Sequence, residues 1–141
     1  MSNYSTEDRN LDLSDMVFEE SVGKYHELEE RALQNAIQVR DFVKQIEKTI
    51  WNNEYLKQIV RSSASVGANY IEANEFLGEK DFLMKVKISR REAKETKYWL
   101  RLIDIENKPE LESKKNQLIQ EAEELRLILS VIINNRIKNM K

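Results

Sequence analysis

Two pairs of glutamates have the spacing that could support chemistry in this chain. Glu72 and Glu75 lie three residues apart, as do Glu92 and Glu95, so each pair falls on one side of a helix. Inward-facing carboxylates can hold a di-metal centre in a four-helix bundle when two helices also supply a Glu-x-x-His motif. Positions 75 and 95 are glutamate rather than histidine. We therefore expect these carboxylates to pair with basic residues or to face water.

The chain offers little other material for catalysis or metal binding. It has no cysteine, and its one histidine, His26, has no nucleophile or orienting carboxylate at a recognisable spacing. The sequence contains no glycine-rich phosphate loop, and the serines of residues 62–65 follow no predicted strand. We therefore predict a protein that is not an enzyme and that uses no cofactor and no metal.

Six charged or amide residues on two predicted helices form a second constellation. They are Arg61, Asn69, Glu72, Arg91, Glu92 and Glu95. Charges between helices must be paired and hydrogen-bonded, and such a network would set helix register rather than add much net stability. The alternative is that these residues are separate polar groups at the helix interface. The sequence leaves both interpretations open.

A basic stripe on one predicted helix is the candidate for contact with nucleic acid. It consists of Lys87, Arg90, Lys94, Lys97 and Arg101. Lysine and arginine on one helical line can follow a phosphate backbone, although no aromatic residues alternate with them to stack on bases. The same stripe would also suit a solvated face, or a docking site for the acidic N-terminal arm.

Charge is unevenly distributed along the 141 residues, although the net charge is only −2. Residues 1–30 carry nine acidic and two basic side chains, whereas residues 80–101 carry eight basic and three acidic ones. The sequence shows no signal-peptide pattern and no apolar run long enough for a membrane span. We therefore expect a cytoplasmic protein with no membrane partner.

Helical periodicity predicts the elements that position these residues. Apolar residues recur at three- and four-residue steps over residues 23–51, 54–77, 80–107 and 109–139. Four amphipathic helices with short connections predict an all-α fold, an antiparallel up-down-up-down four-helix bundle. We assign residues 23–141 to the bundle and residues 1–22 to an acidic N-terminal arm that is partly disordered.

Two stretches predict close packing. Residues 61–74, RSSASVGANYIEAN, carry little side-chain bulk over two turns, which indicates that another helix lies very close. Ser89, Ala93 and Thr96 are the expected partners. Residues 127–133 are apolar at six of seven positions, so this end of the last helix should be buried on more than one side. That second stretch indicates self-association.

Two segments together resemble a known family. The first is VRSSASVGANYIEAN, which includes Arg61 and Glu72, and the second is KDFLMKVKISRREAKETKYWLRL, which includes Asp81. Both are similar to the four-helix-bundle family of proteins encoded in 23S ribosomal RNA intervening sequences. The resemblance extends from about Tyr25 to Ile137 and excludes the N-terminal arm.

The resemblance implies a homopentamer around a central channel, with no established enzymatic activity. One relative, the accessory protein of diversity-generating retroelements, is basic and binds a reverse transcriptase and nucleic acid, whereas this chain has an acidic balance. We therefore expect a non-enzymatic, self-assembling bundle that acts as an interaction scaffold. The alternative is a nucleic-acid-binding accessory protein that contacts an RNA or DNA backbone through the basic stripe.

Overall fold

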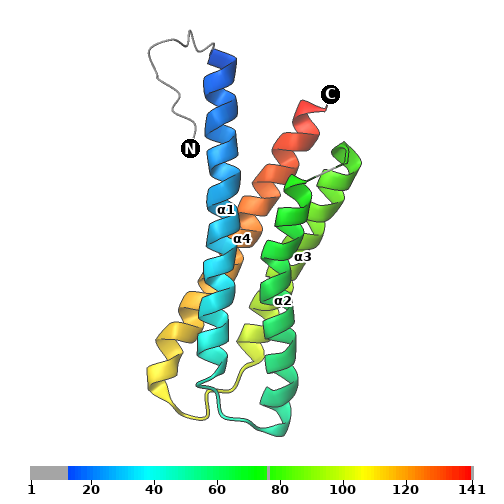
Figure 1. Ribbon diagram of the computed structural model, residues 1–141. Helices are drawn as coiled ribbons and strands as arrows, with labels where there is room; N and C mark the ends of the chain where they lie inside the picture. Colours follow the sequence, from blue (N-terminus) through cyan, green and yellow to red (C-terminus); the bar gives the residue numbers. More distant parts are fainter. Residues whose placement is uncertain (1–12, 76, 141) are drawn as a thin grey trace.

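The computed structural model describes residues 13–75 and 77–140, with side chains from residue 26 onward. Its elements are α1 (Leu13–Val43), α2 (Ile50–Asn74), α3 (Glu79–Leu102), the short 3-10 helix η2 (Pro109–Leu111) and α4 (Glu112–Asn139). The four α-helices form the antiparallel up-down-up-down bundle that the sequence predicts (Figure 1). Helices α2 and α3 pack against each other most extensively, and of the α-helix pairs in contact α1 and α4 pack least.

The first helix ends earlier than its apolar pattern predicts. We expected it to continue to Trp51, but α1 ends at Val43, and the Thr49 hydroxyl caps α2 by accepting a hydrogen bond from the Asn52 amide at 3.0 Å. Ile46 remains buried although it lies in the connection, which is why the apolar pattern continues past the end of the helix. Ile50, the next member of the pattern, is 85% exposed.

Asn52 ties two connections together, a role that its sequence position did not predict. It lies between the predicted helices 23–51 and 54–77, where an asparagine ordinarily stops one helix or caps the next, yet its side chain is fully buried. Its Nδ2 donates to the carbonyls of Glu47 at 3.0 Å and Asp104 at 2.9 Å, and its Oδ1 accepts from the Asp104 amide at 3.1 Å. The α1–α2 and α3–α4 connections are therefore fixed to each other at one end of the bundle.

At the opposite end of the bundle, the start of α1 and the α2–α3 connection also differ from the predicted helix boundaries. Helix α1 begins at Leu13 rather than near Gly23, while residues 1–12 of the expected arm lie outside the described part of the chain. The division of the chain at residue 22 stays a prediction. Gly78 was expected just after the second helix, but it is the N-cap residue of α3, and Glu75 ends α2.

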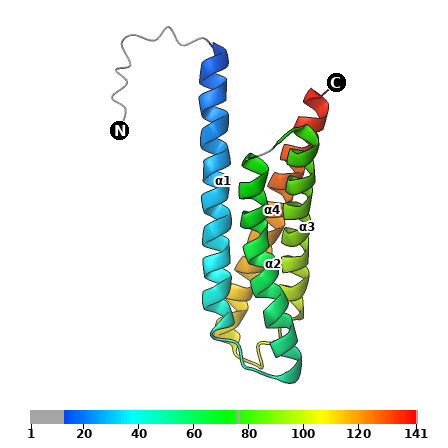
Figure 2. The same cartoon turned by 45° about the vertical axis from the view of Figure 1, so that its right-hand side comes forward.

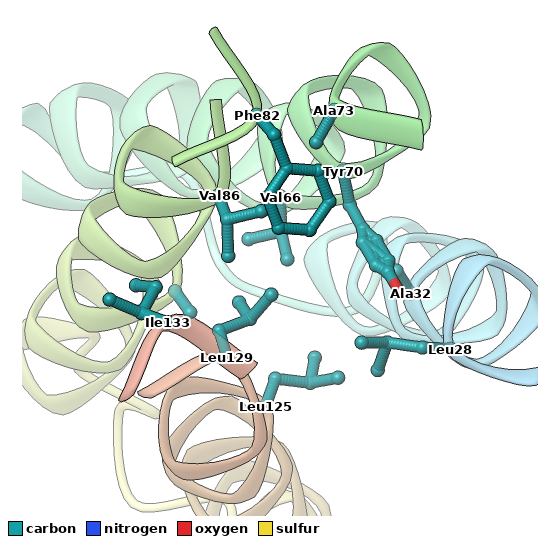
Figure 3. Close-up of a cluster of buried hydrophobic side chains, with 11 residues drawn as sticks. Leu28, Ala32, Val66, Tyr70, Ala73, Phe82, Val86, Leu125, Leu129 and Ile133 are labelled. Atoms are coloured by element: carbon teal, nitrogen blue, oxygen red, sulfur yellow. The ribbon is translucent and has the colours of Figure 1, made fainter. Parts of the chain in front are cut away.

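The core consists of two apolar clusters separated by polar residues. Side chains of all four helices meet in the cluster nearer the α2–α3 connection, among them Leu28, Tyr70, Phe82 and Leu129 (Figure 3). The second cluster lies toward the other two connections and includes Phe42. This division places a polar layer at mid-height in the bundle.

The polar layer is defined by Asn35 of α1, Ser62 and Ser63 of α2, and Thr96 of α3, all of which are buried. Thr96 Oγ1 lies 2.8 Å from Ser62 Oγ, so these two hydroxyls join α3 to α2. Asn35 is 2% exposed, and neither polar atom of its amide has a partner among the described residues. A buried amide without a protein partner lowers stability.

The small-residue stretch of α2 allows close contact with two helices rather than one. Toward α3 the prediction is correct, since Ser89 Oγ donates to the Val66 carbonyl at 2.7 Å. Gly67, however, faces α1, because a Cβ at this position would lie 3.3 Å from the Ala32 Cβ. The absence of a side chain at Gly67 therefore sets how closely α2 approaches α1.

The burial of residues on α3 and α4 shows which of the predicted apolar lines, here called seams, face the core. Three- and four-residue spacing on α3 predicts a buried seam, and all seven of its members are buried: Phe82, Val86, Ser89, Ala93, Thr96, Leu100 and Ile103. A second apolar line predicted on α3 is largely exposed, with Met84 at 52% and Tyr98 at 57%. On α4 the spacing through Leu125 and Leu129 predicts Ile132 as the next core residue, but Ile132 is only partly buried and Ile133 is in the core.

Candidate interaction surfaces

The structure separates the five residues of the predicted basic stripe into two groups. Lys97 Nζ lies 3.2 Å from a carboxylate oxygen of Glu123 on α4, and Arg90 Nη1 lies 3.5 Å from Ser130 Oγ. Lys87, Lys94 and Arg101 are exposed and form no hydrogen bond or ion pair with any described residue. Three of the five charges thus remain available, Lys87 in the first half of α3 and Lys94 and Arg101 in its second half.

Arg126 of α4 adds to these charges across a groove between α3 and α4, a feature that the sequence alone did not reveal. The groove has a volume of about 770 Å³, and its basic lining residues are Lys80, Lys87, Arg90, Arg91, Lys94 and Arg126. Its apolar lining residues are Leu83, Met84 and Ile88. No acidic side chain from the described ranges lines it. We call this feature the basic groove.

Glu123 holds two of the neighbouring cations in place. Its carboxylate accepts a hydrogen bond from Arg126 Nε at 3.0 Å as well as from Lys97. The Arg126 hydrogen bond, helped by Lys97, lowers the pKa of Glu123 to about 2. The same hydrogen bond raises the pKa of Arg126. Arg126 is therefore fixed at the edge of the basic groove, whereas Lys87 and Lys94 are free to reorient.

The predicted polar network assembles in part. Arg61 of α2 lies 3.4 Å from the buried carboxylate of Glu92 and 3.2 Å from Glu95, both on α3. Glu72 pairs instead with Lys85 at 2.7 Å, which raises the pKa of that lysine. The other two predicted members lie apart, since Asn69 donates to the Ser65 carbonyl and Arg91 lines the basic groove.

These contacts account for three of the four glutamates first considered as metal ligands. Glu72, Glu92 and Glu95 each lie against a cation, and Glu75 is exposed. Within residues 13–75 and 77–140, no three histidine, cysteine or acidic side chains are grouped so that they could hold a metal ion. His26 is exposed on α1, 4.0 Å from Glu29. In the same ranges, no helix is long and apolar enough to cross a bilayer.

A second hollow lies between the middle of α1 and the last half of α4. The α1 ribbon diverges from the other helices toward its N-terminal end (Figures 1 and 2). The hollow has a volume of about 1060 Å³, and its apolar lining includes Leu28, Ile128, Val131 and Ile132. We call it the α1–α4 cleft. Arg31, which also lines it, joins α1 to Glu121 of α4 through Nε at 3.0 Å.

The apolar run of α4 extends beyond this cleft onto the surface. Leu127 is 49% exposed and Val131 is 56% exposed, and their four-residue spacing places them on one side of the helix. Leu129 and Ile133 of the same run are buried in the core. The run therefore presents apolar side chains both inward and outward. Burial of its outward side, which the sequence predicts, stays a prediction.

Comparison with known proteins identifies the family. The sequence pattern described as 23S rRNA-intervening sequence protein matches residues 25–131. The chain belongs to this family. A similar structure is that of a protein of unknown function from the S23 ribosomal protein family of Bacteroides thetaiotaomicron VPI-5482. It is 28% identical, has a TM-score of 0.65, and aligns over 75% of this chain and 97% of that one. None of the curated proteins matches the chain. The first 24 residues lie outside the family match.

Proposed function

We propose that this 23S rRNA-intervening sequence family protein is a non-enzymatic scaffold that assembles into a homo-oligomer, a pentamer as the family resemblance implies. The observation that carries the proposal is the outward apolar side of α4. Leu127 and Val131 are each about half exposed beside an open cleft that also has apolar walls. Contiguous apolar surface of this kind marks an interface, because leaving it in water is unfavourable.

The proposed interface has chemically suitable edges. Arg31 closes one end of the α1–α4 cleft through its contacts with Glu121 and Glu124, and Glu121 raises the pKa of Arg31. Arg136 at the other end pairs with Glu79 at 3.0 Å and lies 3.9 Å from the centre of the Phe82 ring. An apolar centre bordered by paired charges matches the anatomy of protein interfaces.

A double substitution on α4 tests this proposal. We expect Leu127→Glu together with Val131→Glu to dissociate the assembly while the chain stays helical, because both side chains point away from the core. Ile71→Glu is the matched control, since Ile71 on α2 is also 49% exposed but lies away from α4. Light scattering measures the mass of each variant. An unchanged mass for the double variant, or equal loss in the control, would refute this interface.

Nucleic-acid binding is the second candidate function, and the basic groove is the observation in its favour. Lys87, Lys94 and Arg126 line a surface without described carboxylates. No aromatic side chain lines the groove, so binding would depend on phosphate contacts alone and would fall steeply with salt. Titration of a labelled single-stranded RNA at low and high salt tests it. Absence of binding at low salt would dismiss this candidate.

A further inference from the structure

The basic groove has two kinds of lining, and only one of them suits a phosphate backbone. Its cations surround apolar side chains, of which Met84 is 52% exposed while Leu83 and Ile88 are partly buried. Phosphates and sugars would pair with the cations but would leave the methionine in water. A ligand that carries carboxylates and apolar side chains together would satisfy both parts of the surface.

The chain itself contains a segment of that composition. Residues 7–20, EDRNLDLSDMVFEE, carry six acidic side chains and one basic one. Their apolar residues are Leu11, Leu13, Met16, Val17 and Phe18. The segment precedes the part of the chain that matches the family, residues 25–131.

We propose that residues 7–20 of one copy bind the basic groove of a second copy. The charges are complementary, since six cations line the groove and the segment has a net charge of −5 from six acidic residues and Arg9. The apolar side chains of the segment cover Met84 and its neighbours. This inference rests on the proposed self-assembly and identifies a contact within it.

The arrangement of the helices favours a second copy over the same molecule. Helices α1 and α3 lie at opposite corners of the bundle, and their described residues make no close backbone approach (Figure 2). Residues 13–20 form the first turns of α1, which lies on the far side of the bundle from α3 (Figure 2). Binding within one molecule would require these turns to unwind, whereas binding to a neighbour leaves α1 intact.

Because the chain has no cysteine, single cysteines can report on this contact in the full-length protein. One sample carries Ser14→Cys and the other Met84→Cys, each with a different affinity tag, and a short bismaleimide is added after mixing. We expect a cross-linked product that contains both tags. Tyr98→Cys is the matched control, because Tyr98 is 57% exposed on α3 but lies outside the groove.

Charge reversal makes the test specific. We expect Lys87→Glu with Lys94→Glu in the Met84→Cys sample to lower the yield by about tenfold, since like charges then face each other. Asp12→Lys with Asp15→Lys in the other sample should restore it. Lys87 and Lys94 have no partner among the described residues, so the fold should survive. Thermal melting checks that it does. Asp12→Lys with Asp15→Lys, mixed with the Met84→Cys sample that keeps Lys87 and Lys94, should also lower the yield of cross-linked product, which tests the contact from the other side.

Several results would overturn the inference. If Tyr98→Cys cross-links as well as Met84→Cys, or if charge reversal leaves the yield unchanged, then the groove is not the binding site. A cross-link that forms only when both cysteines are in one chain would place the contact within the molecule. Single-stranded RNA bound in the groove, with no cross-link, would assign the groove to nucleic acid. Sedimentation separates the two proposals: an oligomer without the cross-link refutes only this contact, and a monomer refutes the scaffold.

Discussion

Gly67→Leu is the substitution that most directly tests how the bundle is packed. Gly67 is buried at the point where α2 approaches α1, and even a Cβ would lie 3.3 Å from the Ala32 Cβ and 3.9 Å from its carbonyl carbon. These atoms belong to a neighbouring helix and cannot rotate away. A leucine places three further carbons beyond the Cβ, so α1 and α2 must move apart.

The expected cost follows from two opposing effects. Overpacking a close helix contact costs about 1–3 kcal/mol and occasionally more, and this site is at the upper end because the contacting atoms are the Ala32 Cβ and backbone, which cannot move without moving α1. Replacing glycine by leucine inside a helix returns about 0.8–1 kcal/mol. The net loss should be about 2 kcal/mol, which corresponds to a fall in melting temperature of about 5–8 °C for a domain of this size.

Thermal unfolding followed by circular dichroism provides the assay. Ala68→Leu is the control, because it introduces the same side chain at the next residue, which is exposed, and should change the melting temperature by less than about 2 °C. Adding Ala32→Gly to Gly67→Leu removes the contacting Cβ and should recover part of the loss. If Gly67→Leu melts like Ala68→Leu, then α1 does not pack on α2 as described.

Three other substitutions have expected outcomes that can be measured by denaturation. Asn52→Ala should cost about 3 kcal/mol, because three hydrogen bonds between the two connections are lost at a buried site, and a loss below about 1 kcal/mol would contradict this. Asn35→Leu should stabilise the protein by about 1 kcal/mol in urea titrations, because the amide has no partner among the described residues, whereas destabilisation would show that it has one. Glu123 has a folded pKa of about 2, below its usual 4.5, so its stabilising contribution is complete above about pH 4.5 and is lost as the pH falls toward 2. Partial exposure limits this contribution to about 1 kcal/mol, and Glu123→Gln should flatten the pH dependence in that window; an unchanged profile would argue against the Arg126 contact.

The sequence predicted the helices well where one apolar period persisted. The α3 seam from Phe82 to Ile103 was correct at every position, whereas a second apolar line on the same helix, with Met84 and Tyr98, is largely exposed. The helix prediction failed where a turn kept the apolar spacing although the helix had already ended. Ile46 is buried from within the α1–α2 connection, so the pattern concealed the end of α1 at Val43 and the cap at Thr49.

Contacts between helices were less predictable than the helices themselves. The small residues of α2 indicated a close partner, but small residues on both sides of one helix do not say which neighbour each side faces. Gly67 was therefore assigned to α3 although it faces Ala32 of α1. The basic groove could not be found from one helix, because Arg126 lies on α4 and its orientation depends on Glu123.

The burial of certain polar residues was the other feature that the sequence did not predict. Asn52 and Asn35 both have the sequence character of ordinary surface residues, yet one holds two connections together and the other lies in the middle of the core. Periodicity places a residue on a face but does not reveal which backbone groups a connection brings near it. Such residues become visible only when the chain is folded.

The oligomeric mass of the full-length protein in solution tests the central proposal most directly. Size-exclusion chromatography with light scattering should give one species of about five times the chain mass at micromolar concentration, because the exposed Leu127 and Val131 would be covered by neighbouring copies. A stable species with the mass of a single chain at the same concentration would contradict the scaffold proposal.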